Sequence, residues 1–135
     1  MTTPSEQRDP EPSDEVVTSV FARRCDSRTA LETVGSKWGI LALLALGEGA
    51  FRFNGLRRKV DGVSERMLAR TLQSLERDGL VVREVHSTIP PRVEYSLTPL
   101  GRRVATTLRG LADILEGSVP ELLEARRRYD DAHPA

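Results

Sequence analysis

The hydrophobic positions in the middle of the chain follow helical spacing, and they predict three consecutive helices. Residues 40–46 are uniformly apolar, which indicates a buried helix, because a membrane span needs about 20 such residues. Residues 54–60 and 64–78 each combine an apolar face with a basic face, and Asp61-Gly62 supplies a turn between them. Two short helices joined in this way are typical of a helix-turn-helix, whose second helix enters the major groove of DNA.

The helix at residues 64–78 has chemical signals at both ends. Ser64 is a good N-cap, since its hydroxyl can accept a hydrogen bond from a free backbone N–H, and Gly79 can take the left-handed conformation that ends a helix. We expect Asn54 to cap the preceding helix in the same way. The apolar stripe consists of Leu68, Leu72 and Leu75, and the opposite stripe of Arg66, Arg70, Gln73 and Arg77.

Beyond Gly79 the pattern changes from helix to strand. Residues 80–84 and 92–97 are rich in Val, Leu and Tyr and predict two strands. The segment 86–91 between them ends in two prolines, which cannot donate ladder hydrogen bonds, so it should form the tip of a wing at residues 84–92. Thr98-Pro99 then begins a long helix. The order predicts a mainly α fold with a small β-hairpin, an α+β winged helix-turn-helix.

Several local motifs, taken together, resemble one family of bacterial regulators. These motifs are Gly35-Ser36-Lys37-Trp38, Phe51-Arg52-Phe53-Asn54-Gly55-Leu56, Ser64-Glu65-Arg66-Met67-Leu68, Leu75-Glu76-Arg77-Asp78-Gly79-Leu80-Val81 and Pro90-Pro91-Arg92-Val93-Glu94-Tyr95-Ser96-Leu97-Thr98-Pro99-Leu100-Gly101. In this order they resemble the HxlR-type, MarR-like winged helix-turn-helix transcriptional regulators, over residues 25–115. The resemblance implies a homodimer that binds double-stranded DNA at an operator with two half-sites. We expect a repressor, although the same DNA contacts also serve activation.

The formal net charge is zero, which hides a basic middle between two acidic ends. Residues 21–113 carry sixteen Lys or Arg against ten acidic residues. Within the helix-turn-helix, residues 52–70 carry six basic residues against Asp61 and Glu65. Contact with phosphates requires such a local excess of positive charge, so the composition is compatible with DNA binding.

The N-terminal half of a recognition helix usually reaches base edges, and this rule ranks the expected contacts. The candidates for base readout are Ser64, Glu65, Arg66, Ala69, Arg70 and Gln73. Arg66 and Arg70 can each donate two hydrogen bonds to guanine, and Gln73 can pair with adenine. Glu65 either favours the helix dipole or accepts a hydrogen bond from cytosine.

Other basic residues are expected at phosphates or in the minor groove. They are Arg57, Arg58, Lys59, Arg77 and Arg92. The first helix crosses the DNA backbone, so its three basic residues would contact phosphate, with a solvated face as the alternative. Arg92 would enter the minor groove from a loop stiffened by proline, or form a salt bridge with Glu84 or Glu94.

A narrow apolar stripe follows Thr98 along one helix: Leu100, Val104, Leu108, Leu111 and Leu115. Such a stripe needs a partner surface, which is either its own domain or a second copy of the chain. The resemblance favours the second copy, so we assign Val104, Leu108, Leu111 and Leu115 to dimerisation. Flanking N- and C-terminal segments would extend this interface through Val16, Val17, Val20, Phe21, Val119, Leu122 and Leu123.

Cys25 is the single cysteine of the chain and a candidate redox switch. Arg23 and Arg24 would favour its thiolate, and Asp26 would oppose it. Some regulators of the resembling type sense oxidants through a cysteine in this N-terminal position, although Asp26 stands where that family often has proline. The alternative is a small buried hydrophobic residue.

The sequence lacks a nucleophile with a base, a cluster of metal ligands and a glycine-rich phosphate loop, so we predict neither an enzyme nor a cofactor or metal site. Two alternatives stay open beside the regulator: a winged helix used for protein–protein contact, and a small-molecule effector bound near Trp38, Phe51 or Phe53.

The expected organisation has three parts. Residues 1–15 form a disordered acidic tail, residues 16–115 the winged helix-turn-helix domain with its N-terminal helices and long C-terminal helix, and residues 116–135 a short helix and tail. With no signal peptide and no membrane span in the sequence, we expect a cytoplasmic protein without a membrane partner.

Overall fold

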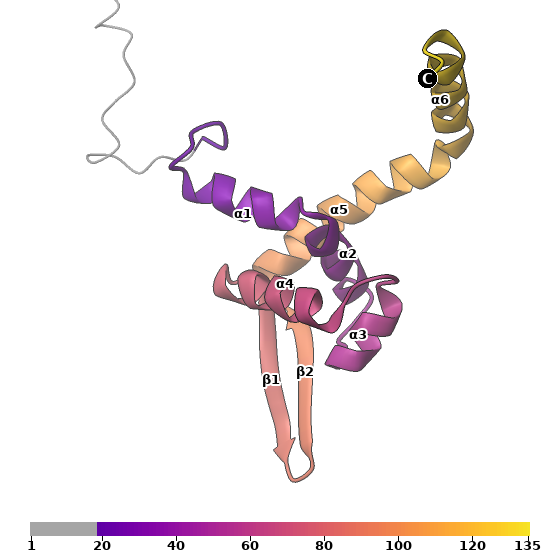
Figure 1. The fold of residues 1–135 in the computed structure, drawn as a ribbon. Helices are drawn as coiled ribbons and strands as arrows, with labels where there is room; N and C mark the ends of the chain where they lie inside the picture. Colours follow the sequence, from indigo (N-terminus) through magenta and orange to yellow (C-terminus); the bar gives the residue numbers. More distant parts are fainter. Residues whose placement is uncertain (1–18) are drawn as a thin grey trace, which may run out of the picture.

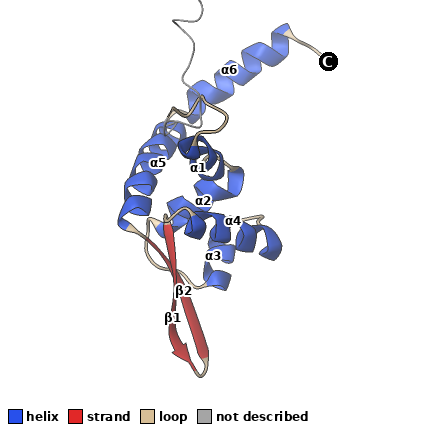
Figure 2. Cartoon of the chain, turned by 90° about the vertical axis from the view of Figure 1, so that its left-hand side faces the viewer, coloured by secondary structure: helices blue, strands red, loops and turns tan. Residues whose placement is uncertain are grey.

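The computed structural model describes residues 19–135, and these residues form six helices and one antiparallel hairpin (Figure 1). The helices are α1 (Asp26–Val34), α2 (Lys37–Leu46), α3 (Phe53–Lys59), α4 (Glu65–Arg77), α5 (Pro99–Gly117) and α6 (Val119–Ala132), and the strands are β1 (Val81–Thr88) and β2 (Pro91–Leu97). The hairpin projects from one end of the domain, and α5 leads to α6 at the other end (Figure 2). This is the predicted α+β winged helix-turn-helix. The predicted tail, Val16 and Val17 lie outside the described residues.

The core forms around α2, the helix predicted to be buried. α2 begins at Lys37 because the Ser36 hydroxyl accepts a hydrogen bond from the Gly39 N–H at 3.1 Å. Its apolar side chains pack against α3, α4 and α5. The most completely buried large side chains are Leu43, Leu46, Leu56, Leu68, Leu72 and Leu75. Burial of these leucines holds α3 and α4, the two helices of the helix-turn-helix, against α2.

The boundaries of α4 are those that the sequence predicts. The Ser64 hydroxyl accepts from the Met67 N–H at 3.1 Å, and Gly79 has a φ of 76°, the left-handed conformation that follows the helix end. The predicted Asn54 cap is wrong, because α3 already begins at Phe53 with Arg52 as its N-cap. The reason is a long-range contact: Phe51 exchanges backbone hydrogen bonds with Tyr95 of β2, and this extended residue fixes the point from which the helix starts.

The wing is longer than the sequence predicts. β1 continues to Thr88 rather than ending at Glu84, and only Ile89 and Pro90 remain as the turn. A register shift between Val85 and Ser87 places two residues of β1 against one of β2, which lets the pairing continue past the expected strand end. The result is a long two-stranded arm whose tip lies well away from the core (Figure 2).

The start of α5 is fixed to the junction between α4 and β1. As predicted, Thr98 is the N-cap, and its hydroxyl accepts from the Gly101 N–H at 2.9 Å while donating to the Gly79 carbonyl at 2.6 Å. Gly101 packs so closely on Leu80 that a Cβ there would collide with the Leu80 carbonyl. Within residues 19–135 no single helix is long and apolar enough to cross a membrane; α1 and α2, bent by 77° at their break, pass this test only as a pair.

Candidate nucleic-acid interface

The two faces of α4 have opposite chemistry. Leu68, Leu72 and Leu75 are buried. Thr71 is buried beside them, and its hydroxyl donates a hydrogen bond to the Met67 carbonyl at 2.8 Å. The solvent-facing side carries Glu65, Arg66, Arg70, Gln73 and Arg77, all exposed, with Ala69 half-buried. A helix held by its apolar face and capped by Ser64 therefore presents guanidinium and amide donors in one direction, as major-groove readout requires.

The first helix of the motif adds positive charge beside the N-terminus of α4. A hollow of about 570 Å³ is lined by Asn54, Arg57, Arg58, Val63 and Glu65. Arg57 and Arg58 are exposed at its edge, next to the first turn of α4. The structure thus brings together predicted phosphate contacts from α3 and predicted base contacts from α4.

Lys59 differs from its two neighbours. Its ammonium Nζ lies 2.9 Å from Oε1 of Glu48, just beyond the end of α2. This ion pair joins the C-terminal end of α3 to the central helix, and both groups are about half exposed. Sequence reasoning did not reveal the pair, because the two residues are separated by a loop and meet only in the folded chain.

The wing carries one of the expected arginines. Arg92 is exposed at the start of β2, and among the described residues it forms no ion pair with Glu84 or Glu94. Glu94 instead pairs with His86, whose Nε2 lies 2.9 Å from Oε1 of the carboxylate. The salt-bridge alternative for Arg92 is therefore absent in this part of the chain, and its guanidinium is available at the arm's tip.

Beyond Leu100, which is 46% exposed, the apolar stripe of α5 divides into two halves. Val104 and Leu108 pack against the core of their own domain. Leu111 and Leu115 are about half exposed, and the stripe continues through exposed residues that include Ile114, Val119 and Leu123. Ile114, which is 66% exposed, was not part of the predicted stripe, although it lies three residues from Leu111.

Cys25 is fully buried and is the N-cap residue of α1. Burial raises the pKa of its thiol, but hydrogen bonds from the Ser27 hydroxyl and from the backbone N–H groups of Arg28 and Ser27 lower it by more, so the pKa lies below its ordinary value. The sulfur is 2.6 Å from the Ser27 hydroxyl oxygen. The groups that favour the thiolate are therefore at the start of a helix, a feature that the sequence did not reveal, whereas Asp26 opposes it as expected.

The three aromatic side chains proposed near an effector, Trp38, Phe51 and Phe53, pack against the hydrophobic core. Phe51 also forms the backbone bridge to the wing. Among the described residues, no group of three or more His, Cys, Asp or Glu side chains lies close enough together to hold a metal ion.

A helix-turn-helix, a hairpin arm and a long helix with an apolar stripe thus follow in this order along the chain. A family model for the HxlR-like helix-turn-helix matches residues 33–122. The chain belongs to the HxlR-like helix-turn-helix family. This chain and its relatives are transcriptional regulators with a helix-turn-helix DNA-binding domain.

Individual relatives extend the HxlR-like assignment over most of the chain. The HTH-type transcriptional regulator YtfH of Escherichia coli strain K12 is 52% identical over 108 residues, which cover 80% of this chain and 86% of YtfH. A solved structure of the transcriptional regulator ytfH from Salmonella typhimurium is 50% identical, with a TM-score of 0.75, covering 81% of this chain and 97% of that one. The redox regulator HypR in its reduced form is 35% identical, with a TM-score of 0.65, covering 73% and 97%.

Proposed function

We propose that the protein is a homodimeric repressor that binds an operator with two half-sites. The observation that carries this proposal is the division of α4 into a buried leucine face and an exposed face with Arg66, Arg70 and Gln73. A helix with this division can lie in the major groove without disturbing its own packing. Binding at a promoter excludes the polymerase by overlap alone, so repression needs no surface beyond those that bind DNA and the second copy.

The proposed DNA contacts follow the position of each side chain. Base readout falls to the N-terminal half of α4, at Ser64, Glu65, Arg66, Ala69, Arg70 and Gln73. Phosphate contacts fall to Arg57, Arg58 and Arg77, and Arg92 reaches the minor groove from the wing. Lys59 is expected to contribute less to phosphate contact, because it is paired with Glu48 at 2.9 Å.

The second copy is proposed to cover the exposed half of the α5 stripe and the adjoining face of α6. The residues involved are Leu111, Ile114, Leu115, Val119 and Leu123, all of which are more than 40% exposed in the single chain. Exposed apolar patches of this kind typically mark an interaction surface. Two-fold symmetry would then present two copies of α4 to half-sites about 34–36 Å apart, one turn of DNA.

The test is a fluorescence-anisotropy titration of the protein against DNA from immediately upstream of its own gene, at two salt concentrations. A scrambled duplex of the same composition is the control. Sequence-specific regulators prefer their operator over other DNA by about 10³–10⁷, and their affinity falls steeply with salt. Equal weak binding to both duplexes would count against this operator, and a promoter run-off assay that shows no loss of transcript on binding would count against repression.

A second candidate function is oxidation-dependent control through Cys25. The contact with the Ser27 hydroxyl and the lowered thiol pKa favour it, as does the similarity to the redox regulator HypR. Because the sulfur is buried, an oxidant reaches it only when the start of α1 opens. The test compares the operator affinity of wild-type and Cys25→Ser protein before and after treatment with peroxide. If peroxide lowers the affinity of both proteins equally, this candidate is rejected.

A further inference from the structure

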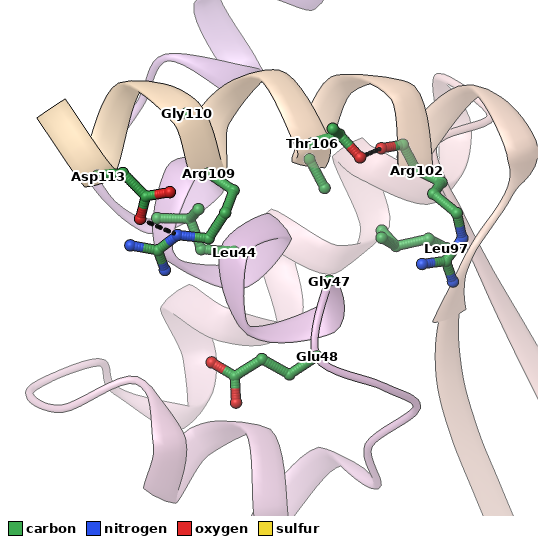
Figure 3. Close-up of a pocket in the computed structure, with 10 residues that line it drawn as sticks. Leu44, Gly47, Glu48, Leu97, Arg102, Thr106, Arg109, Gly110 and Asp113 are labelled. Carbon is green, nitrogen blue, oxygen red and sulfur yellow. Dashed lines mark hydrogen bonds and ion pairs between the residues drawn. The ribbon is translucent and has the colours of Figure 1, made fainter.

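A cavity of about 370 Å³ lies between α2 and α5, apart from the proposed DNA contacts and the exposed stripe (Figure 3). Its apolar lining comes from Leu44 on α2, Leu97 at the end of β2 and Ala105 on α5. Ala105 is almost fully buried, and the two leucines are half-buried. Its size lies within the range of about 300–1,000 Å³ that is usual for small-molecule sites.

Two glycines are among the residues that line the cavity. Gly110 lines the cavity in the middle of α5, and a Cβ built on it would meet no atom within 4 Å. Gly47 faces it from the end of α2, where a Cβ would lie 3.2 Å from the Leu44 carbonyl oxygen and 3.7 Å from the Cβ of Ala105. A glycine within a helix is less favourable than alanine. Gly110 leaves open space at the cavity wall that a longer side chain could occupy.

The charged groups around the cavity are not equivalent. Arg109 is 2.9 Å from Asp113 and 2.6 Å from Glu116, and the Asp113 carboxylate raises the pKa of its guanidinium. Glu48 is held by Lys59. Arg102, at the end of the cavity near Leu97, forms no ion pair within the described part of the chain (Figure 3). Glu48 and Asp113, the acids of the lining, are thus paired with Lys59 and Arg109. The Arg102 guanidinium has no such partner among the described residues and lies beside the apolar part of the lining.

We propose that this cavity binds a small amphipathic organic anion. A ring or short aliphatic body would lie on Leu44, Leu97 and Ala105, and a carboxylate would accept hydrogen bonds from the Arg102 guanidinium. Guanidinium and carboxylate match in geometry and charge, and such hydrogen bonds are stronger than neutral ones. A cation is disfavoured, because Glu48 and Asp113 already have partners.

The experiment is a calorimetric titration of the full-length protein with benzoate, and with benzamide as the uncharged analogue. Benzoate should bind saturably, and benzamide at least about tenfold more weakly, since a hydrogen bond to a charged group contributes about 1.5–3 kcal/mol. Arg102→Gln should weaken benzoate binding by a similar factor. The matched control is Arg103→Gln, which changes the next residue of α5 outside the cavity and should leave binding unchanged.

A second pair of variants tests the location without weakening the fold. Gly110→Leu places a side chain in open space that leads into the cavity and should abolish benzoate binding. Gly117→Leu makes the same change in open space at the end of α5, outside the cavity, and should have no effect. The proposal is overturned if wild-type protein does not bind benzoate at millimolar concentration, if benzamide binds equally well, or if binding survives in Arg102→Gln or Gly110→Leu. None of these results depends on DNA binding.

Discussion

The exposed arginines of α4 have the same chemistry but lie at different depths along the helix. Arg66 is the second residue of α4 and Arg77 is the last, with Arg70 between them. Only the N-terminal half of a recognition helix usually reaches base edges, so we expect Arg66 to read bases and Arg77 to contact phosphate. On this hypothesis, position along the helix, rather than residue type, determines what each arginine contributes to specificity.

Arg66→Ala should relax the base preference of the protein. The loss expected is about 1–3 kcal/mol of discrimination, because a guanidinium that donates two hydrogen bonds to guanine is replaced by a methyl group. Selection of binding sites from a randomised operator measures this directly, since the preferred base at one position of each half-site should become degenerate.

The control for this change is Arg77→Ala at the other end of α4. It should weaken binding to all duplexes to a similar extent and lower the dependence of affinity on salt, as expected when a phosphate contact is removed. An unchanged base preference in the Arg66→Ala protein would show that Arg66 does not read bases.

At the scale of whole elements, α5 begins in a contact that only glycine allows. Gly101→Ala would drive a Cβ into the Leu80 carbonyl, and backbone atoms cannot move aside as a flexible side chain can. We expect the free energy of unfolding to fall by about 1–3 kcal/mol, the usual cost of overpacking. Urea denaturation followed by circular dichroism measures it.

Gly110→Ala is the matched control on the same helix. Its Cβ meets open space, so the higher helix propensity of alanine should raise the free energy of unfolding by about 0.5–1 kcal/mol. If both substitutions changed stability in the same direction, close packing at the start of α5 would not be the reason for Gly101.

We expect the wing to contribute to DNA binding through Arg92, which lies near its tip. Arg92→Ala should weaken operator affinity severalfold while leaving the melting temperature nearly unchanged, because the side chain is exposed and has no ion-pair partner among the described residues. A gel-shift titration measures the affinity. Arg126→Ala on α6, which lies at the opposite end of the molecule from the wing (Figure 1), is the control and should bind DNA normally. Equal affinity for all three proteins would remove the wing from the interface.

The sequence predicted the elements whose ends carry local signals. α4 has Ser64 at one end and Gly79 after the other, and α5 has Thr98-Pro99, so these boundaries follow from residues within a few positions. The start of α3 and the length of β1 depend instead on contacts between distant residues. The bridge from Phe51 to Tyr95 and the register shift in the hairpin leave no mark in the local pattern.

The candidate site shows the same division. The segregation of α4 into a basic and an apolar face was visible from helical periodicity alone. The pairing of Lys59 with Glu48 and the cavity beside Arg102 both require two elements to meet, and no spacing within one element indicates them.

At the scale of the whole molecule, the structure divides into three regions. The wing projects at one end, α2 and α4 lie together in the middle, and α5 leads outward to α6 at the other end (Figure 1). The apolar stripe crosses this division, since Val104 and Leu108 pack in the core whereas Leu111 and Leu115 lie beyond it. A test of dimerisation must therefore use the outer half, because a charge at Leu108 would also disrupt the domain.

Leu115→Glu should convert the proposed dimer to a folded monomer. Leu115 is 47% exposed in the single chain, so a carboxylate there is solvated in the monomer but would be buried without a partner in a dimer, which is strongly unfavourable. Sedimentation velocity measures the change in mass, and circular dichroism shows whether the helices persist. Operator affinity should fall steeply as well, because each copy would then contact only one half-site.

The control is Thr106→Glu, which adds the same charge to the same helix. Nine residues at 100° per residue place Thr106 on the face of α5 opposite Leu115, and Thr106 is exposed. This variant should remain dimeric and bind the operator. If Leu115→Glu sedimented as a dimer, the outer stripe would not be the interface; if it became monomeric yet bound the full operator normally, DNA binding would not require two copies.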